Sequence, residues 1–342
     1  MSVQIDPDDW LRVLCGKTES SLLARDDNWS PNSRQCDNFT QYSLWELRRH
    51  LASQFVGSTT EKRRWPDFVI RLRKPKNSEN ALFDTSALQL TVGSSDGRPA
   101  MFQVASNFNC HENSSVLTNI YDGKYLTRLM TDATQGPCAA AGAGIGAIQR
   151  WQEHRRQPIN LLSNLHIFDV QNGKLTNVNS GTEAVDFEQT KVGLHANVDA
   201  NFDRSQRKSC QYWPKAPRKV DQVFVSTISM RLFRNSCNRV RKAAEVAERK
   251  LLRAAYQGTY MLARVRKTSV LVLTLVGGGV FENAIEDIAL AIADAHVEHC
   301  SEQGTALETV LLPIYAAVDH KCIIKTLIAQ GCPESSIKIK YA

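Results

Sequence analysis

The chain has 342 residues and a formal charge of +7, and its 42% hydrophobic and 23% charged residues are typical of a globular protein. Its longest apolar run, residues 270–280, is shorter than a transmembrane helix, and the start MSVQIDPDDW lacks the features of a secretory signal. Nine cysteines without C-x-x-C spacing indicate reduced thiols, not a disulfide framework or a zinc site. We therefore expect a cytoplasmic protein that binds neither a metal nor a membrane.

Positive charge is concentrated in two stretches, residues 62–76 and residues 239–267. Acidic residues interrupt both stretches, and neither alternates basic with aromatic residues as a nucleic-acid platform does. A solvent-exposed helix face is the favoured interpretation, and a patch for an anionic partner is the alternative. No nucleic-acid partner is expected.

The first 80 residues are expected to form a helical N-terminal extension. The segment SLWELRRHLASQF has apolar residues at spacings of three and four, as in an amphipathic helix. These residues are Leu44, Leu47, Leu51 and Phe55. Because the rest of the chain must cover such a stripe, we divide the protein into an extension, residues 1–80, and a main domain, residues 81–342.

The main domain is expected to begin with hairpins and to continue with alternating strands and helices. Two hairpins are predicted, LQLTV–SSDGRP–MFQVA and HIFDV–QNGK–LTNV, the second with Asn172-Gly173 as its turn. KVGLHANVDANF and QVFVSTI predict further strands, followed by a helix over residues 238–263, the strand SVLVLTLV, a helix from about Ala284 and the strand ETVLLPIYA. This order predicts an α/β fold whose ligand site lies at the C-terminal ends of the central strands.

The segment TQGPCAAAGAGIGAIQRW matches the dinucleotide fingerprint G-x-G-x-x-[G/A] at residues 142–147. A Rossmann fold needs a strand directly before this motif and an acidic residue about 20 positions later, and both are missing here. Pro137 and the alanine run instead place the glycines inside a helix. Its small face either packs closely on a neighbouring element, or its N-terminus near Thr134, Gln135 and Gly136 faces a ligand.

The segment LVLTLVGGGVFEN is the stronger indication of a ligand site. A buried strand is expected to end at Val276, and three glycines separate it from the helix that begins near Ala284. Glycines in this position turn backbone N–H groups inward beside a helix N-terminus, where they bind anions. No Lys-Ser/Thr pair follows, so this is not a P-loop. A plain turn is the alternative, but three consecutive glycines favour a phosphate or diphosphate site.

The pattern strand-GGGVFEN-helix resembles the diphosphate-binding loop of the macrodomain fold, in particular its poly(ADP-ribose) glycohydrolase-like branch. QVASNFNCHENS, TDATQGP and VFVSTISMRLF resemble further parts of the same site, in that order along the chain. Together they are similar to the atypical macrodomain hydrolases that include Legionella effectors acting on ADP-ribosylated ubiquitin. The resemblance covers about residues 85–318 and implies a macrodomain-like mixed sheet sandwiched between helices.

The resemblance also implies an ADP-ribose site at named positions. The glycine loop would hold the diphosphate, with Phe281 stacked on a ribose and Asn283 steadying the loop, while two asparagines would bind the proximal ribose. The implied ADP-ribose-binding residues are Asn107, Asn109, Thr134, Gln135, Gly136, Ser226, Thr227, Gly277, Gly278, Gly279, Val280, Phe281 and Asn283. The implied catalytic carboxylates are Glu112 and Asp132, with Asp122 as a third candidate.

Carboxylates suit this chemistry, because cleavage of a glycosidic bond to ribose passes through an oxocarbenium-like cation that a carboxylate stabilises. Asp122 can equally be a turn residue in YDGK, and Asp132 can be a helix cap. The sequence departs from the family in two places. The first loop lacks vicinal glutamates and has Glu112 alone, and Glu282 stands where a glycine is common in the family.

The implied function is hydrolysis of the bond between ADP-ribose and a modified protein, with ADP-ribosylated ubiquitin as a candidate substrate. One alternative is a reader module that binds ADP-ribose without turnover, and another is an enzyme acting on a nucleotide or an NAD-derived metabolite. No cofactor is expected. The modified protein would be recognised by the N-terminal extension or by the hairpin around residues 169–179.

Overall fold

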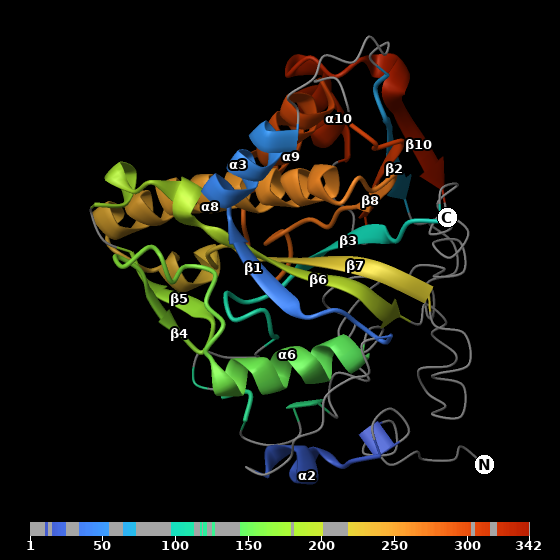
Figure 1. Ribbon diagram of the computed structural model, residues 1–342. Helices are drawn as coiled ribbons and strands as arrows, with labels where there is room; N and C mark the ends of the chain where they lie inside the picture. Colours follow the sequence, from blue (N-terminus) through green and yellow to red (C-terminus); the bar gives the residue numbers. More distant parts are fainter. Residues whose placement is uncertain are drawn as a thin grey trace, which may run out of the picture.

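In the computed structural model of the chain, helices cover both faces of one large mixed sheet (Figure 1). The residues that the structure describes are 11–12, 16–24, 34–54, 64–72, 97–112, 117, 119–121, 125–126, 144–178, 181–200, 218–301, 305–314 and 320–341. Among them, no helix has the length and hydropathy that crossing a membrane requires. This layered arrangement confirms the predicted α/β fold class.

The large sheet has eight strands among the described residues, in the order β1-β6-β7-β3-β8-β9-β2-β10. Their bounds are β1 Phe39–Ser43, β2 Asp67–Leu72, β3 Ala100–Ala105, β6 Lys191–Ala200, β7 Arg218–Val225, β8 Val270–Val272, β9 Thr309–Ile314 and β10 Ile337–Tyr341. All of them run in one direction except β6, which is antiparallel to β1 and β7. A separate hairpin consists of β4 (Asp169–Gln171) and β5 (Lys174–Asn177).

The helices divide between the two faces of this sheet (Figure 1). The α-helices are α2 Glu19–Leu23, α3 Leu44–Gln54, α6 Gly144–Arg156, α8 Asn238–Val265, α9 Ile285–Cys300 and α10 His320–Ala329. The short 3-10 helices are η1 Thr182–Ala184, η2 Phe187–Gln189, η4 Met230–Phe233 and η5 Glu334–Ser336. The layer of α3, α8, α9 and α10 covers one face, and α6 lies on the other.

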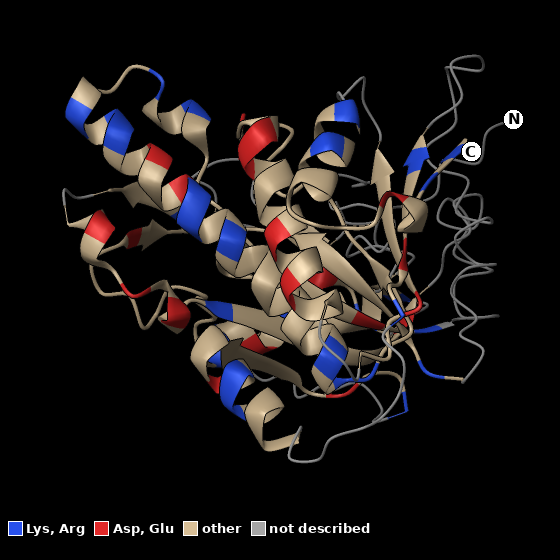
Figure 2. Cartoon of the chain, turned by 90° about the horizontal axis from the view of Figure 1, so that it is seen from above, with Lys and Arg blue, Asp and Glu red and all other residues tan. Residues whose placement is uncertain are grey.

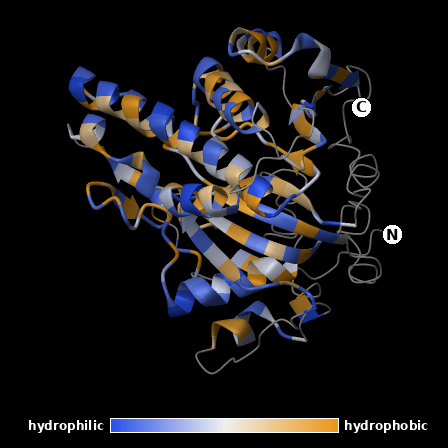
Figure 3. Ribbon diagram, turned by 45° about the horizontal axis from the view of Figure 1, so that its top comes forward, coloured by the Kyte–Doolittle hydropathy of each residue, from blue (hydrophilic) through white to orange (hydrophobic). Residues whose placement is uncertain are grey.

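Hydrophobic residues recur along the sheet, whereas α8 has both hydrophobic and hydrophilic residues along its length (Figure 3). The buried side of α8 includes Tyr256, Tyr260 and Met261, which belong to the main core. Gly258 lies so close to β6 that an added Cβ would stand 2.6 Å from Cγ1 of Val192. The glycine therefore allows the long helix to lie directly on the sheet.

The small-residue segment packs on β6 through Gly146. A Cβ on this glycine would lie 3.0 Å from Cγ1 of Val198 and 3.1 Å from the ring of His195. Close packing on a strand, one of the two predicted roles of the small face, is therefore confirmed for the described part of this helix. The implied ligand residues Thr134, Gln135 and Gly136 lie outside the described residues.

Most predicted elements are confirmed, including the hairpin at the Asn172-Gly173 turn, both long helices and the strands that contain MFQVA, QVFVSTI and ETVLLPIYA. The strand predicted to reach Val276 instead ends at Val272. Leu273 N–H still donates to the Leu311 carbonyl (2.8 Å). Further along, side chains also accept from the backbone: Thr274 N–H donates to Gln103 Oε1 (3.1 Å), and Val276 N–H donates to the Tyr256 hydroxyl (3.1 Å). The predicted strand LQLTV lies outside the described residues. The hairpin predicted for MFQVA is wrong, because β3 pairs on both of its edges with parallel strands, β7 and β8.

The region predicted as a helical extension also has strands of the main sheet. The apolar stripe of α3 is buried as expected at Leu44, Leu47 and Leu51. However, β1 pairs with β6, and β2 lies between β9 and β10. These two strands are not among the elements that the sequence pattern predicts. The division at residue 80 stays a prediction, but the described residues on its two sides share one sheet and one core.

Candidate functional site

Three segments predicted to bind one ligand come together at one edge of the sheet. Strands β7, β3 and β8 are adjacent and parallel, so their C-terminal ends lie side by side. A cavity of about 140 Å³ lies where the chain leaves these strands. Its lining residues are Ala105, Ser106, Glu112, Thr227, Thr274, Leu275, Val276, Gly277, Gly279, Val280 and Phe281.

The glycine loop has a conformation that requires glycine at its first position. Gly277 has φ +76°, and a Cβ there would lie 2.5 Å from Asn283 Oδ1 and 2.8 Å from Thr227 Cγ2. Asn283 N–H donates to the Gly277 carbonyl (3.1 Å), and Asn283 Nδ2 donates to Thr227 Oγ1 (3.5 Å). Asn283 thus closes the loop and links it to Thr227, two residues beyond the end of β7.

Four loop residues that line the cavity have unused backbone donors. Four N–H groups of the loop have no hydrogen-bond acceptor among the described residues: those of Gly277, Gly279, Val280 and Phe281. The same four residues line the cavity. Gly278 differs, because its N–H donates to the Leu275 carbonyl (3.1 Å) and it does not line the cavity. The loop therefore forms a concave surface suited to an anion beside the N-terminus of α9.

A buried carboxylate on α8 holds the far end of this loop. The N–H of Ala284, the residue before α9, donates to Glu248 Oε1 (3.0 Å), and Glu248 also bonds to the Asn283 side chain. Burial raises the pKa of Glu248 to about 7, against the lowering effect of these hydrogen bonds. Sequence reasoning missed Glu248, because nothing in a long amphipathic helix reveals which residue faces a loop 36 positions away.

The two asparagines of the first loop do not line the cavity. Asn109 is buried, its Oδ1 accepts from the His111 N–H (3.1 Å), and its side chain lies against Gly173. Asn107 is also buried, and its Nδ2 has no acceptor among the described residues. The structure thus places Asn109 within its own loop and leaves only Glu112, of the predicted residues in this segment, at the cavity.

The β4–β5 hairpin adds a cation that the sequence analysis did not predict at the site. Phe108 N–H donates to the Gly173 carbonyl (2.7 Å), which fastens the hairpin turn to the first loop. Lys174, the next residue, has its Nζ 5.5 Å from the centre of the Phe281 ring and interacts with Glu112. Burial lowers the pKa of Lys174, while the Glu112 carboxylate acts in the opposite direction. The Asn-Gly turn was recognisable in the sequence, but its packing partner was not.

A neutral histidine and a tyrosine hold the backbone at Glu112. The Glu112 N–H donates to the Tyr125 hydroxyl (3.1 Å), and this hydroxyl also lies 3.2 Å from His111 Nδ1. Burial places the pKa of His111 well below its ordinary value, with nearby Arg150 acting in the same direction. His111 is therefore uncharged at neutral pH and helps to position the loop.

The remaining predicted residues are only partly placed. Thr227 lines the cavity, whereas Ser226 is buried and does not, and its Oγ has no partner among the described residues. The catalytic candidates Asp122 and Asp132 lie outside the described residues. A cavity of about 140 Å³ is smaller than the roughly 300 Å³ lower bound for drug-sized ligands, so the described walls suit a diphosphate and not a whole dinucleotide.

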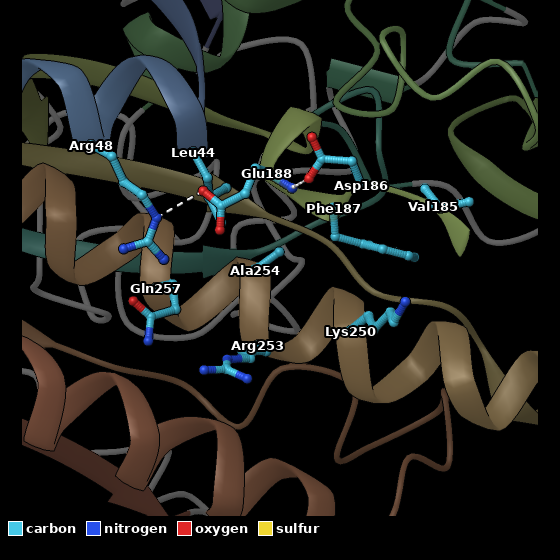
Figure 4. A pocket seen from close by; sticks show the side chains of 10 residues that line it. All are labelled: Leu44, Arg48, Val185, Asp186, Phe187, Glu188, Lys250, Arg253, Ala254 and Gln257. Atoms are coloured by element: carbon cyan, nitrogen blue, oxygen red, sulfur yellow. Dashed lines mark hydrogen bonds and ion pairs between the residues drawn. The ribbon is translucent and has the colours of Figure 1, made fainter. Parts of the chain in front are cut away.

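A second cavity, of about 360 Å³, lies between α3, η2 and α8 and contains no predicted site residue (Figure 4). Its charged groups are largely paired with one another or with the backbone. Arg48 bonds to Glu188 (2.8 Å) and Glu298 (3.0 Å), and Lys250 Nζ donates to the Glu183 carbonyl (2.7 Å). This pairing indicates that the charges join surface elements, so the smaller cavity remains the candidate site.

No protein-family model matches the chain, and no curated protein matches it in sequence. Among solved structures, the poly(ADP-ribose) glycohydrolase of Deinococcus radiodurans in complex with ADP-ribose is similar, with a TM-score of 0.50 and 13% identity, over 86% of this chain and 95% of that chain. The poly(ADP-ribose) glycohydrolase of Thermomonospora curvata has a TM-score of 0.47 and 14% identity, over 85% of each chain.

The D. radiodurans structure agrees with the glycohydrolase-like resemblance and gives no support to the narrower Legionella effector branch. A likeness at 13% identity shows the fold and not the activity. The chain thus has the macrodomain-like mixed α/β fold of the poly(ADP-ribose) glycohydrolases, as its motifs implied.

Proposed function

We propose that the chain is a hydrolase that cleaves the glycosidic bond between ADP-ribose and a modified protein. One observation supports this most strongly. In the glycine loop, the residues whose N–H groups have no partner among the described residues are the same residues that line the cavity. Such a surface fits a diphosphate. The D. radiodurans structure of similar fold was solved with ADP-ribose, which is the ligand proposed for this site.

In the proposed reaction, the bond between ribose C1″ and the oxygen or nitrogen of the modified side chain breaks, and its electron pair stays with the leaving atom. Water adds to C1″ and its proton ends on the leaving atom, so the products are ADP-ribose and unmodified protein. Glu112, which lines the cavity, would stabilise the cationic transition state or accept the proton from water. Asp132 and Asp122 remain the candidates for a second group.

A reader of ADP-ribose that lacks turnover is the second candidate function. Glu112 provides the one carboxylate among the described residues that line the cavity. Most glycosidases use two carboxyl groups, one on either side of the bond that breaks. The described part of the site therefore supports binding more completely than it supports catalysis.

We further propose ADP-ribosylated ubiquitin as the first protein substrate to test and the cytoplasm as the compartment. The resemblance of VFVSTISMRLF and QVASNFNCHENS to hydrolases acting on that substrate supports the former. Buried, unpaired thiols such as Cys36, Cys110 and Cys300 support a reducing compartment.

Thermal unfolding with ADP-ribose, NAD, ATP and AMP tests the binding step. ADP-ribose at a hundred times its Kd is expected to stabilise the protein by about 2.7 kcal/mol, and the mononucleotides are expected to stabilise it less. Equal stabilisation by AMP would favour an enzyme of nucleotide metabolism. The absence of any stabilisation by ADP-ribose would contradict both the hydrolase and the reader.

Turnover is tested separately with ADP-ribosylated ubiquitin, other mono-ADP-ribosylated proteins and poly(ADP-ribose). Glu112→Gln is expected to slow hydrolysis by about a hundredfold or more while ADP-ribose binding persists. Glu334→Gln, an exposed carboxylate at the start of η5, is the matched control and is expected to change neither property. Binding by the wild-type protein without turnover of any substrate would favour the reader.

A further inference from the structure

A basic surface lies beside the candidate site, on η4, on the start of α8 and on the chain that joins them. Its cations are Arg231, Arg234, Arg239, Arg241 and Lys242, all of them exposed, and no acidic residue occurs between the first and the last. Figure 2 shows blue segments, which mark lysine and arginine, on the outer end of α8 and on the turn next to it. We refer to residues 231–242 together with Val280 as the basic surface.

Part of this charge is not neutralised within the molecule. Arg234 pairs with Glu282, and Arg241 pairs with Glu245 (3.2 Å). Arg231, Arg239 and Lys242 have no ion pair with any described residue. The first turn of α8 adds positive potential, because it has no acidic residue and no side-chain cap. The net effect is an exposed region that attracts negative charge.

The basic surface borders the cavity directly. Arg231 N–H donates to the carbonyl of Phe281, a lining residue of the glycine loop, at 3.2 Å. On either side of this hydrogen bond lie two exposed apolar side chains, Leu232 at 49% and Val280 at 72% exposure. Protein interfaces are enriched in arginine and combine apolar contacts with a polar rim.

We propose that the basic surface binds an acidic segment of the protein that bears the ADP-ribose, with an apolar side chain of that segment on Leu232 and Val280. This inference rests on the proposed function and names the chemistry of its partner. A protein fits better than a nucleic acid, because bases stack on exposed aromatic rings and the one aromatic residue of the stretch, Phe233, is only 5% exposed. Binding here would present a modified side chain to the cavity mouth.

The test uses the full chain and three fluorescein-labelled peptides: an acidic peptide containing leucines, the same peptide with serine for leucine, and its lysine-containing counterpart. Anisotropy is measured at low and at high salt. The wild-type protein is expected to prefer the acidic leucine peptide. Arg239→Glu with Lys242→Glu is expected to weaken this binding by about tenfold, and Leu232→Ser is expected to weaken it to a lesser extent.

The matched control is Lys325→Glu with Lys340→Glu, a charge reversal on α10 and β10, which is expected to leave peptide binding unchanged. ADP-ribose binding is measured for every variant and is expected to persist. With ADP-ribosylated acidic protein as substrate, the surface variants are expected to raise KM and leave kcat unchanged.

Equal peptide binding by the surface variants and the control would overturn the proposal. Equal affinity for the leucine and serine peptides would also overturn it. So would a competition experiment in which single-stranded RNA displaces the labelled acidic peptide more effectively than unlabelled acidic peptide does. Failure of the wild-type protein to bind ADP-ribose would instead contradict the proposed function, and the peptide measurements separate the two cases.

Discussion

The backbone N–H of Ala284 and the buried carboxylate of Glu248, 3.0 Å apart, join the glycine loop to α8. The contact links the N-terminus of α9, where an anion would bind, to a helix that spans the main core. A group that holds a ligand loop in this way affects the stability of the protein and the shape of the site together. Because this group is a carboxylate, the effect depends on pH.

Glu248 is expected to make the protein less stable as the pH rises. Its pKa of about 7 in the folded protein lies above the ordinary 4.5, so the folded state binds the proton more tightly than the unfolded state. The stabilisation is therefore complete below pH 4.5 and is lost as the pH rises to about 7. Glu248→Gln removes this dependence. We expect the free energy of unfolding of the variant to rise by about 1 kcal/mol relative to that of the wild type as the pH increases from 4.5 to about 7.

The check is a series of thermal unfolding curves from acid to neutral pH for the wild type, Glu248→Gln and the exposed control Glu334→Gln. The control is expected to follow the wild type. Parallel pH dependence for all three proteins would show that another group is responsible.

Gly277 and Gly279 provide a matched pair within the glycine loop. Gly277→Ala is expected to destabilise the protein by about 2 kcal/mol and to abolish ADP-ribose binding, because φ is +76° and the new Cβ would meet Asn283 and Thr227. Gly279→Ala is expected to change stability by less than about 0.5 kcal/mol, because nothing lies within 4 Å of its Cβ. Urea unfolding and calorimetric titration with ADP-ribose measure both effects, and equal destabilisation by the two substitutions would refute the assignment.

The hairpin turn allows the same comparison at a second position. Gly173 and Gly97 both have positive φ, but only the Cβ of Gly173 would meet a neighbour, Asn109 Cγ at 2.4 Å. Gly97→Ala is expected to cost about 1 kcal/mol, and Gly173→Ala is expected to cost at least about 1 kcal/mol more because the hairpin must move from the first loop. Denaturant unfolding measures the loss of stability in each variant. Equal losses in Gly97→Ala and Gly173→Ala would show that the hairpin does not pack on Asn109.

Lys174 is expected to contribute to the affinity for an anionic ligand. Its ammonium lies beside the Phe281 ring and interacts with Glu112, and both of these residues line the cavity. Lys174→Met is expected to weaken ADP-ribose binding by about tenfold, and Lys174→Arg is expected to restore most of it. Titration calorimetry at two salt concentrations is the measurement, and Lys325→Met is the control on α10. Unchanged affinity in Lys174→Met would remove this residue from the site.

The sequence by itself determined the features that depend on local pattern. Apolar periodicity predicted α3, α8 and α9, and the Asn172-Gly173 pair predicted the hairpin, because helix faces and tight turns are properties of a few neighbouring residues. The glycine loop was recognisable for the same reason, since its conformation depends on residues that are adjacent in the chain.

Only the tertiary structure decided which distant residues meet. Glu248 reaches Ala284, Lys174 reaches Phe281, and β1 and β2 join the main sheet, because packing places elements together that are far apart in sequence. Packing also separated Asn109, which bonds within its own loop, and Asn107, which is buried outside the cavity lining, from Glu112, which lines the cavity. Residue type and spacing cannot show which side chain is buried and which lines a cavity, because this depends on the distant segments that pack at the same edge of the sheet.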